Sequence, residues 1–344
     1  MGLVTTQDSM GAAGLELRVA EQADVAVARR LAGSRARELG FPELREHQVE
    51  LVVTEMATNL VKYASDGRLL VSAGRSDGTS CIDLLSLDTG PGMDDAAGHL
   101  ADGSSTGTSL GVGLGAIDRL SDVFDIYSEG SGGTVVMARV ARGDAPRSGG
   151  STVGAVSRPP ASETVCGDAW AVEERDGRLM VMVADGLGHG AGAATASTQA
   201  VEVFRRQSHL SVEELVASIH AELRATRGAA VAVAEVRPDA SVRFCGVGNI
   251  SGMVATAAGR REMVTHHGTA GHQATRIRSF DYALEPGALV ILHSDGVSSR
   301  WDLSDHPQLA ARHPLLVAGV LYRHHGRTRD DATVVVVAPD RGTP

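Results

Sequence analysis

Two apolar runs of this chain end in an aspartate followed by a glycine. Leu179–Ala184 is one of them and Ala288–His293, with one serine interposed, is the other. Short apolar runs of this kind indicate buried strands, so the carboxylates of the aspartates that follow them should lie at strand ends. Four aspartates share this setting, after or near a predicted strand: Asp168, Asp185, Asp295 and Asp330. The chain is therefore expected to fold so that several strands end in one acidic cluster.

A convergent acidic cluster is typical of a site for hard divalent cations. Mg²⁺ and Mn²⁺ prefer oxygen ligands, and carboxylates at strand ends supply them. Two such ions about 3.5–4 Å apart activate a bridging water and hold a phosphoryl group. A single Asp-Gly pair is more often a turn, but four acidic positions favour a metal site. Cys166 lies beside Asp168 and lacks the Cys-x5-Arg arrangement of thiol phosphatases.

A second, unrelated set of residues lies upstream. Glu55 and Asn59 are four apart on a predicted helix and share one face. Asp88 follows an apolar strand and could accept a hydrogen bond from an adenine amine, while the glycines after it let the base approach the backbone. The glycine-rich run 107–115 leads into a helix, whose first N–H groups bind phosphate. Each feature alone also fits a solvated helix face, a turn or a flexible loop.

In this order and spacing, the three upstream features resemble the GHKL ATPases. Within that family they look like the serine kinases of bacterial partner-switching systems, over roughly residues 15–140. The resemblance implies Mg²⁺ and ATP, with Asn59 as the metal ligand and Glu55 as the base that deprotonates a protein serine or threonine. It also implies a set of nucleotide-binding residues: Asn59, Asp88, Gly90, Gly92, Gly111, Gly113, Gly115 and Thr134.

The downstream aspartate series resembles the metal-dependent protein phosphatases (PPM, type 2C) in their SpoIIE-like branch, over about residues 151–340. The resemblance implies hydrolysis of phosphoserine or phosphothreonine. It implies two Mn²⁺ or Mg²⁺ ions held by Asp168, Asp185, the Gly186 carbonyl, Asp295 and Asp330. Asp331 would support these ligands by hydrogen bonding. His189 is either a general acid or a helix-start residue, and Arg158 is a candidate phosphate clamp.

These patterns predict an α/β chain of two domains, which suits 344 residues. Residues 1–142 should form a GHKL (Bergerat) two-layer α/β sandwich, and residues 151–344 a PPM-type α-β-β-α sandwich. Residues 143–150 have the composition of a linker. The main predicted helices are Asp24–Leu39, Glu43–Ala64, Leu114–Leu120, Ala191–Arg206, Val212–Thr226 and Leu315–Arg323.

Composition limits the classes of partner and the cellular location that we expect for this chain. A net charge of -10 argues against nucleic acid, because phosphate backbones demand a basic face. No apolar run approaches the ~20 residues of a membrane span. Three distant cysteines give no disulfide framework and favour a cytoplasmic location.

The two sets of residues together predict a protein serine/threonine phosphatase fused to an ATP-binding serine kinase domain. The resemblance implies a STAS-type anti-sigma antagonist or scaffold as the substrate, in a bacterial partner-switching pathway, and a sigma factor as a further partner. Two alternatives stay open: a phosphatase regulated by a non-catalytic nucleotide-binding domain, and a nucleotide-dependent anti-sigma factor.

Overall fold

The computed structural model describes residues 13–76, 79–93, 110–130, 132–143, 152–175, 177–274 and 276–339. Residues 144–150 of the predicted linker, and the glycine-rich run before Leu110, lie outside these ranges. The predicted domain limits at residues 142 and 151 therefore stay predictions.

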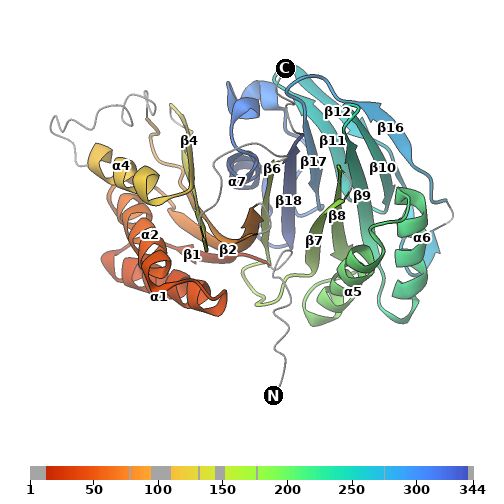
Figure 1. The fold of residues 1–344 in the computed structure, drawn as a ribbon, viewed down its shortest axis with the longest axis horizontal. Coiled ribbons are helices and arrows are strands. Elements are labelled where there is room, and N and C mark those ends of the chain that lie inside the picture. Colours follow the sequence, from red (N-terminus) through yellow and green to blue (C-terminus); the bar gives the residue numbers. More distant parts are fainter. Residues whose placement is uncertain are drawn as a thin grey trace.

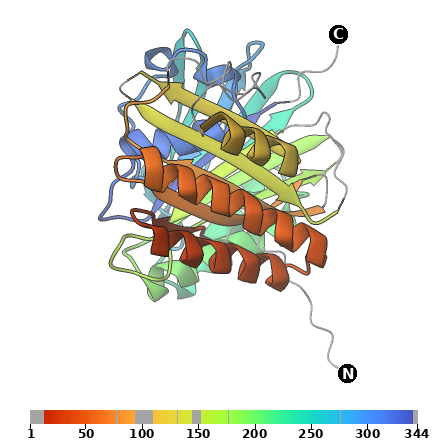
Figure 2. The same cartoon turned by 90° about the vertical axis from the view of Figure 1, so that its left-hand side faces the viewer.

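The N-terminal half is a five-stranded antiparallel sheet with helices on one face (Figures 1 and 2). In sheet order, the strands are β1 (Leu15–Arg18), β2 (Arg68–Ser76), β3 (Thr79–Leu87), β5 (Gly133–Ala141) and β4 (Val123–Glu129). The helices are α1 (Gln22–Glu38), α2 (Glu43–Tyr63) and α4 (Leu110–Leu120). Val52 and Met56 of α2 pack with Ile82 of β3 in the core between the two layers. This is the predicted two-layer sandwich.

The C-terminal half packs two sheets face to face. The first sheet contains β7 (Asp168–Arg175), β8 (Arg178–Gly186), β9 (Ala229–Arg237), β10 (Ser241–Val247), β13 (Thr265–His266) and β16 (Phe280–Ala283). The second contains β6 (Thr152–Arg158), β18 (Ala332–Ala338), β17 (Leu289–His293), β11 (Ser251–Thr256) and β12 (Gly259–Met263). A short pair, β14 (Gly268–Thr269) and β15 (Gln273–Ala274), lies apart. Val183 of β8 and Leu292 of β17 belong to the core between the two main sheets.

Helices cover both outer faces of this pair of sheets. The first sheet carries α5 (Ala191–Gln207) and α6 (Val212–Glu222), with Phe204 and Leu215 buried against it. The second sheet carries α7 (Pro314–His325). The predicted α-β-β-α order is confirmed.

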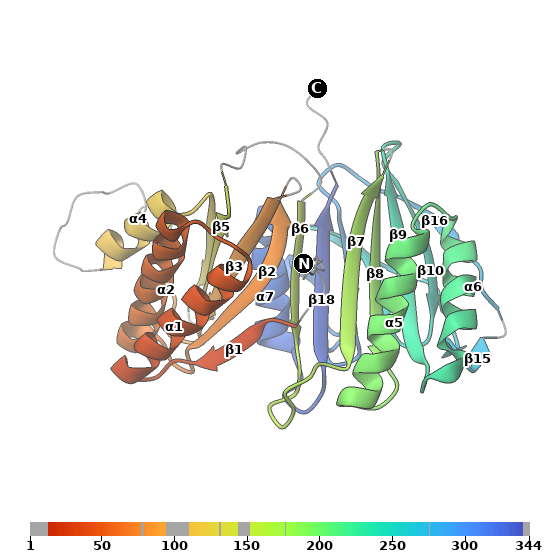
Figure 3. The same ribbon diagram turned by 60° about the horizontal axis from the view of Figure 1, so that its bottom comes forward.

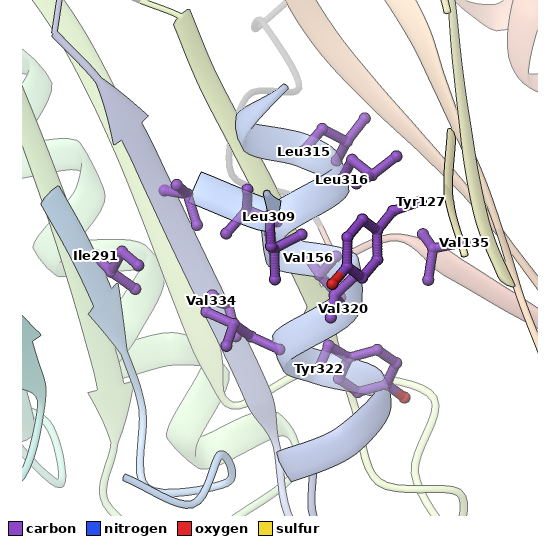
Figure 4. Packing of buried hydrophobic residues seen from close by; sticks show 14 of the residues in the cluster. Tyr127, Val135, Val156, Ile291, Leu309, Leu315, Leu316, Val320, Tyr322 and Val334 are labelled. Atoms are coloured by element: carbon purple, nitrogen blue, oxygen red, sulfur yellow. The ribbon is translucent and has the colours of Figure 1, made fainter. Parts of the chain in front are cut away.

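Helix α7 has no solvent-facing side along most of its length. Its residues from Pro314 to Arg323 are all buried. One hydrophobic cluster joins it to both halves of the chain, including Val334 of β18 and Val135 of β5 (Figure 4). Seen from below, the helix stands between the N-terminal sheet and β6 and β18 (Figure 3). The two halves therefore share one continuous core.

Polar contacts also cross this junction. Glu16 of β1 accepts a hydrogen bond from the Tyr322 hydroxyl at 2.8 Å and lies 3.5 Å from the Arg158 guanidinium. Arg158 further donates to the backbone carbonyls of Pro159 and Arg327, both at 2.7 Å. Arg158 is thus buried in the junction, and its proposed role as a phosphate clamp is wrong.

Candidate nucleotide and metal sites

The nucleotide-site residues gather where α2, α4 and β5 meet. A cavity of about 180 Å³ opens there. Asn59, Asp88, Gly92 and Thr134 line it together with apolar side chains, among them Met56, Leu60, Leu114, Ile117 and Val136. Apolar walls with few polar groups are what a planar aromatic base requires.

Asp88 is the polar centre of this cavity. Its Oδ1 accepts from the Gly90 amide at 2.7 Å, and its own amide donates to the Thr134 carbonyl at 3.1 Å. Burial raises the pKa of the Asp88 carboxyl and outweighs the backbone hydrogen bonds and the charge of Arg323, which act in the opposite direction. The Thr134 hydroxyl lies 3.0 Å from that of Ser128, which also accepts from the Met93 amide. These bonds fix a carboxylate that can accept from an exocyclic amine.

Glu55 lies beside this cavity rather than in its lining. Helix α4 packs closely against α2 at Gly113. A Cβ at that position would stand 3.1 Å from Glu55 Oε2 and 3.4 Å from Asn59 Oδ1. Gly111 and Gly115 lie in the same helix, which begins four residues before the predicted start at Leu114. These glycines are therefore inside α4, where Gly113 permits close helix packing, and not in a loop ahead of it.

Two aspartates of the second site lie on neighbouring strands of one sheet, and the other two lie next to the ends of strands in the other sheet. Asp168 and Asp185 lie opposite each other in the β7–β8 pair. Asp295 follows β17, and Asp330 precedes β18. Burial raises the pKa of Asp185, and the charges of Asp168, Asp295 and Asp330 raise it further. The predicted carboxylates thus come close enough to repel one another.

Hydrogen bonds hold two of these carboxylates in position. Ser294 donates to Asp168 Oδ2 at 2.6 Å and accepts from the Thr333 amide at 3.0 Å. Asn249 donates to Asp295 Oδ2 at 2.7 Å. The sequence analysis gave no role to these three supporting residues, Asn249, Ser294 and Thr333.

The site fits a divalent cation. Asp168 is 3% exposed, and its Oδ1 has no hydrogen-bond partner among the described residues. A buried, unpaired carboxylate oxygen inside a negative cluster stays ionised only when a positive charge compensates it; otherwise the group takes up a proton. No three of these carboxylates bring oxygens within 4.8 Å of one another in the described part of the chain. The cluster is thus wider than a cage for one small ion.

The start of α5 and the residues around it lie next to the end of strand β8, which carries Asp185. A Cβ on Gly186 would lie 2.0 Å from the Ala193 carbonyl, so the start of α5 packs on the strand end. His189 precedes α5, is exposed and lies 2.9 Å from Glu163 Oε1. Arg227 is exposed and covers Gly192 at the first turn of α5, where a Cβ would meet the guanidinium carbon at 2.7 Å. The sequence analysis assigned Arg227 no role.

Two family profiles match the chain. The histidine kinase-like ATPase domain matches residues 19–140, and Stage II sporulation protein E (SpoIIE) matches residues 175–340. The serine/threonine-protein kinase RsbT of Bacillus subtilis (strain 168) is 31% identical over 122 residues, which are 36% of this chain and 92% of RsbT. The phosphoserine phosphatase RsbX of the same organism is 22% identical over 138 residues, 40% of this chain and 69% of RsbX.

A solved structure is also similar to this chain. This structure, described as "The bacterial stressosome: a modular system that has been adapted to control secondary messenger signaling", is 28% identical with a TM-score of 0.51 and covers 55% of this chain and 99% of its own. The predicted resemblance of both halves is confirmed. No helix within the described ranges combines the length and apolar character that a membrane span needs.

Proposed function

Since the chain belongs to the RsbT-like serine/threonine-protein kinases of the histidine kinase-like ATPase family, and carries a SpoIIE-type phosphatase domain behind that kinase domain, we propose that it switches the phosphorylation of a partner protein in both directions. One site would add a phosphate to a serine or threonine and the other would remove it. The observation that carries this proposal is the presence of two chemically opposed sites on one continuous core.

In the kinase half, we assign ATP to the cavity beside α4, with adenine on Asp88 and Thr134. Asn59 would hold Mg²⁺ at the phosphates, and Glu55 would take the proton of the attacking hydroxyl. Both contact the first turn of α4 at Gly113, so the phosphates would lie at the start of α4 beside these two side chains. Phosphoryl transfer depends mainly on positioning and on neutralising charge.

In the phosphatase half, we assign two Mg²⁺ or Mn²⁺ ions to Asp168, Asp185, the Gly186 carbonyl, Asp295 and Asp330. Such ions supply an activated water and neutralise phosphoryl oxygens. Ser294 and Asn249 would keep the carboxylates oriented. We add Arg227 as the group that receives the phosphoryl oxygens of the substrate, because its guanidinium is exposed and lies over Gly188 and Gly192, in the segment that follows Asp185.

The partner that fits this chemistry best is a STAS-type anti-sigma antagonist or scaffold, in a cytoplasmic partner-switching pathway. RsbT, to which the first half is similar, is a serine/threonine-protein kinase, and RsbX, to which the second half is similar, is a phosphoserine phosphatase. A sigma factor would be a further partner if the kinase half also sequesters it.

The test is a two-step incubation with a panel of STAS proteins. With ATP and Mg²⁺, one panel member should gain phosphate on serine or threonine; after ATP is removed and Mn²⁺ added, it should lose that phosphate. Glu55→Ala should abolish the first step and leave the second, and Asp185→Asn should do the reverse. If no panel member gains or loses phosphate, the proposal fails.

A second candidate is a phosphatase that senses nucleotide without kinase chemistry. Glu55 lies outside the cavity lining, and Arg323 of α7 donates to the Asp88 carbonyl at 3.1 Å, which ties the cavity to the phosphatase half. This candidate predicts that Glu55→Ala changes neither ATP binding nor its effect on dephosphorylation.

A further inference from the structure

Three potential metal ligands meet at the junction of the two halves, next to the nucleotide cavity but outside its lining and apart from the aspartate site. Glu129 ends β4, His306 precedes α7, and His324 lies in the last turn of α7. One ligand atom from each lies within 4.8 Å of the other two. Among the residues that the structure describes, this is the trio that reaches such proximity.

The distances suit a tetrahedral ion. His306 Nδ1 lies 2.7 Å from Glu129 Oε1, and His324 Nε2 lies 3.7 Å from Glu129 Oε2. Bonds of about 2.1 Å at tetrahedral angles separate neighbouring ligand atoms by roughly 3.4 Å. The two observed distances run to different oxygens of Glu129, one below and one above that value, so side-chain movements would have to bring one oxygen and both nitrogens around an ion.

A supporting side chain suits an ion as well. The Tyr127 hydroxyl donates to Glu129 Oε1 at 2.7 Å, the same oxygen that lies 2.7 Å from His306 Nδ1. Tyr127 thus orients this carboxylate, as a supporting partner of a metal ligand does.

We propose that Glu129, His306 and His324 form a binding site for a transition-metal dication, Zn²⁺ foremost, that joins the kinase-like half to the phosphatase half. Two imidazoles and one carboxylate select Zn²⁺ over Mg²⁺, which prefers oxygen ligands alone. The ion would bridge β4 and α7 and so stabilise the shared core.

Arg323 competes for this site. Its Nη2 donates to His324 Nε2 at 2.7 Å and lies 3.9 Å from Glu129 Oε2. An incoming ion must displace that N–H and withstand the charge of the guanidinium. Loss of the guanidinium should therefore tighten zinc binding.

The test measures zinc bound by the full chain after chelation and equilibrium dialysis. Asp185→Asn and Asp295→Asn are introduced first, so that the aspartate site does not retain zinc. About one ion per chain is expected, together with a rise in the thermal midpoint. His324→Gln, at a partly exposed position, should remove both effects, and Arg323→Gln should lower the zinc concentration needed for half-saturation.

The control is His325→Gln, whose ring centroid lies 6.1 Å from that of His324 and which is outside the trio. It should leave zinc binding unchanged. Absence of zinc from the doubly substituted chain, or its retention in the folded His324→Gln variant, would overturn the proposal; the residues would then be hydrogen-bonding partners only. The outcome is independent of whether either enzymatic activity is found.

Discussion

At the scale of single residues, the aspartate cluster makes the metal-free chain sensitive to pH. Burial raises the pKa of Asp168 and of Asp185, and neighbouring carboxylates raise both further. The folded chain therefore binds protons that the unfolded chain has released. This contribution to stability is complete below the ordinary aspartate pKa of about 4 and is lost as pH rises through the raised pKa values.

We therefore expect the chelated chain to unfold at a lower temperature at pH 8 than at pH 5. Asp185→Asn removes a repelling charge and should stabilise the chelated chain at pH 8 by about 1–3 kcal/mol. Thermal unfolding in chelator measures both effects, and Asp118→Asn on exposed α4 surface is the control. Added Mn²⁺ should stabilise the native chain at pH 8 and not the variant. Equal pH profiles for the native chain and Asp185→Asn would contradict this account.

The four aspartates of the proposed metal site could be singled out from the sequence because each adjoins or lies near an apolar strand, whose end fixes the carboxylate. Their supporting residues could not. Ser294 and its partner Asp168 are 126 positions apart, and Asn249 and Asp295 are 46 apart. Only the packing of two sheets brings such pairs together. Local pattern carries no information about these contacts.

Asp88 gives a second prediction at this scale. One oxygen accepts from the Gly90 amide, which leaves the other for an adenine amine. In Asp88→Asn, one of these two acceptors becomes a donor, so ATP should bind at least about tenfold more weakly. Calorimetric titration with ATP measures this, and Asp66→Asn at an exposed position is the control. Unchanged affinity would remove Asp88 from the nucleotide site.

At the scale of elements, the long periodic helices and the apolar strands were predicted correctly. Five short strands were missed, β12 to β16, because none of them carries a continuous apolar run. The start of α4 was placed too late because glycine is a poor helix former, and its helical glycines are held by packing.

Helix α7 carried a signal that sequence reasoning did not use. Its segment Pro314–Tyr322 is apolar on every side, and a helix of that kind is buried on every side. Such a pattern predicts a helix between two layers, here the sheets of the two halves. The shared core could have been expected on that ground.

Gly319 tests this packing. A Cβ there would lie 3.2 Å from Leu85 and 3.3 Å from Val135, both in the N-terminal sheet. Gly319→Leu should overpack the junction and cost about 1–3 kcal/mol. Urea unfolding should show one transition in the native chain and two in the variant. Gly143→Leu, where a Cβ meets no atom within 4 Å, should leave the single transition intact. Two transitions already in the native chain would contradict a shared core.

At the scale of the whole molecule, a continuous series of contacts connects the nucleotide cavity with the aspartate site. Arg323 donates to the Asp88 carbonyl from the last turn of α7. Just beyond that helix, the Arg327 amide donates to the Gly296 carbonyl at 2.7 Å, and the Ser298 amide donates to the His325 carbonyl at 2.9 Å. Gly296 directly follows Asp295. A change at Asp88 can thus displace a proposed metal ligand through α7.

This connection predicts energetic coupling between the two sites. Saturating ATP should change the apparent affinity for Mn²⁺ by about fivefold or more, and Mn²⁺ should change ATP affinity by the same factor, because linkage is reciprocal. In zinc-free buffer, Arg323→Gln should abolish both effects, since it removes the contact with Asp88. Arg312→Gln breaks a different contact across the junction, 3.3 Å from Asp125, and should preserve them. Coupling that survives Arg323→Gln would show that the two sites communicate by another route. If the native chain shows no coupling between ATP and Mn²⁺, the shared core holds two independent enzymes.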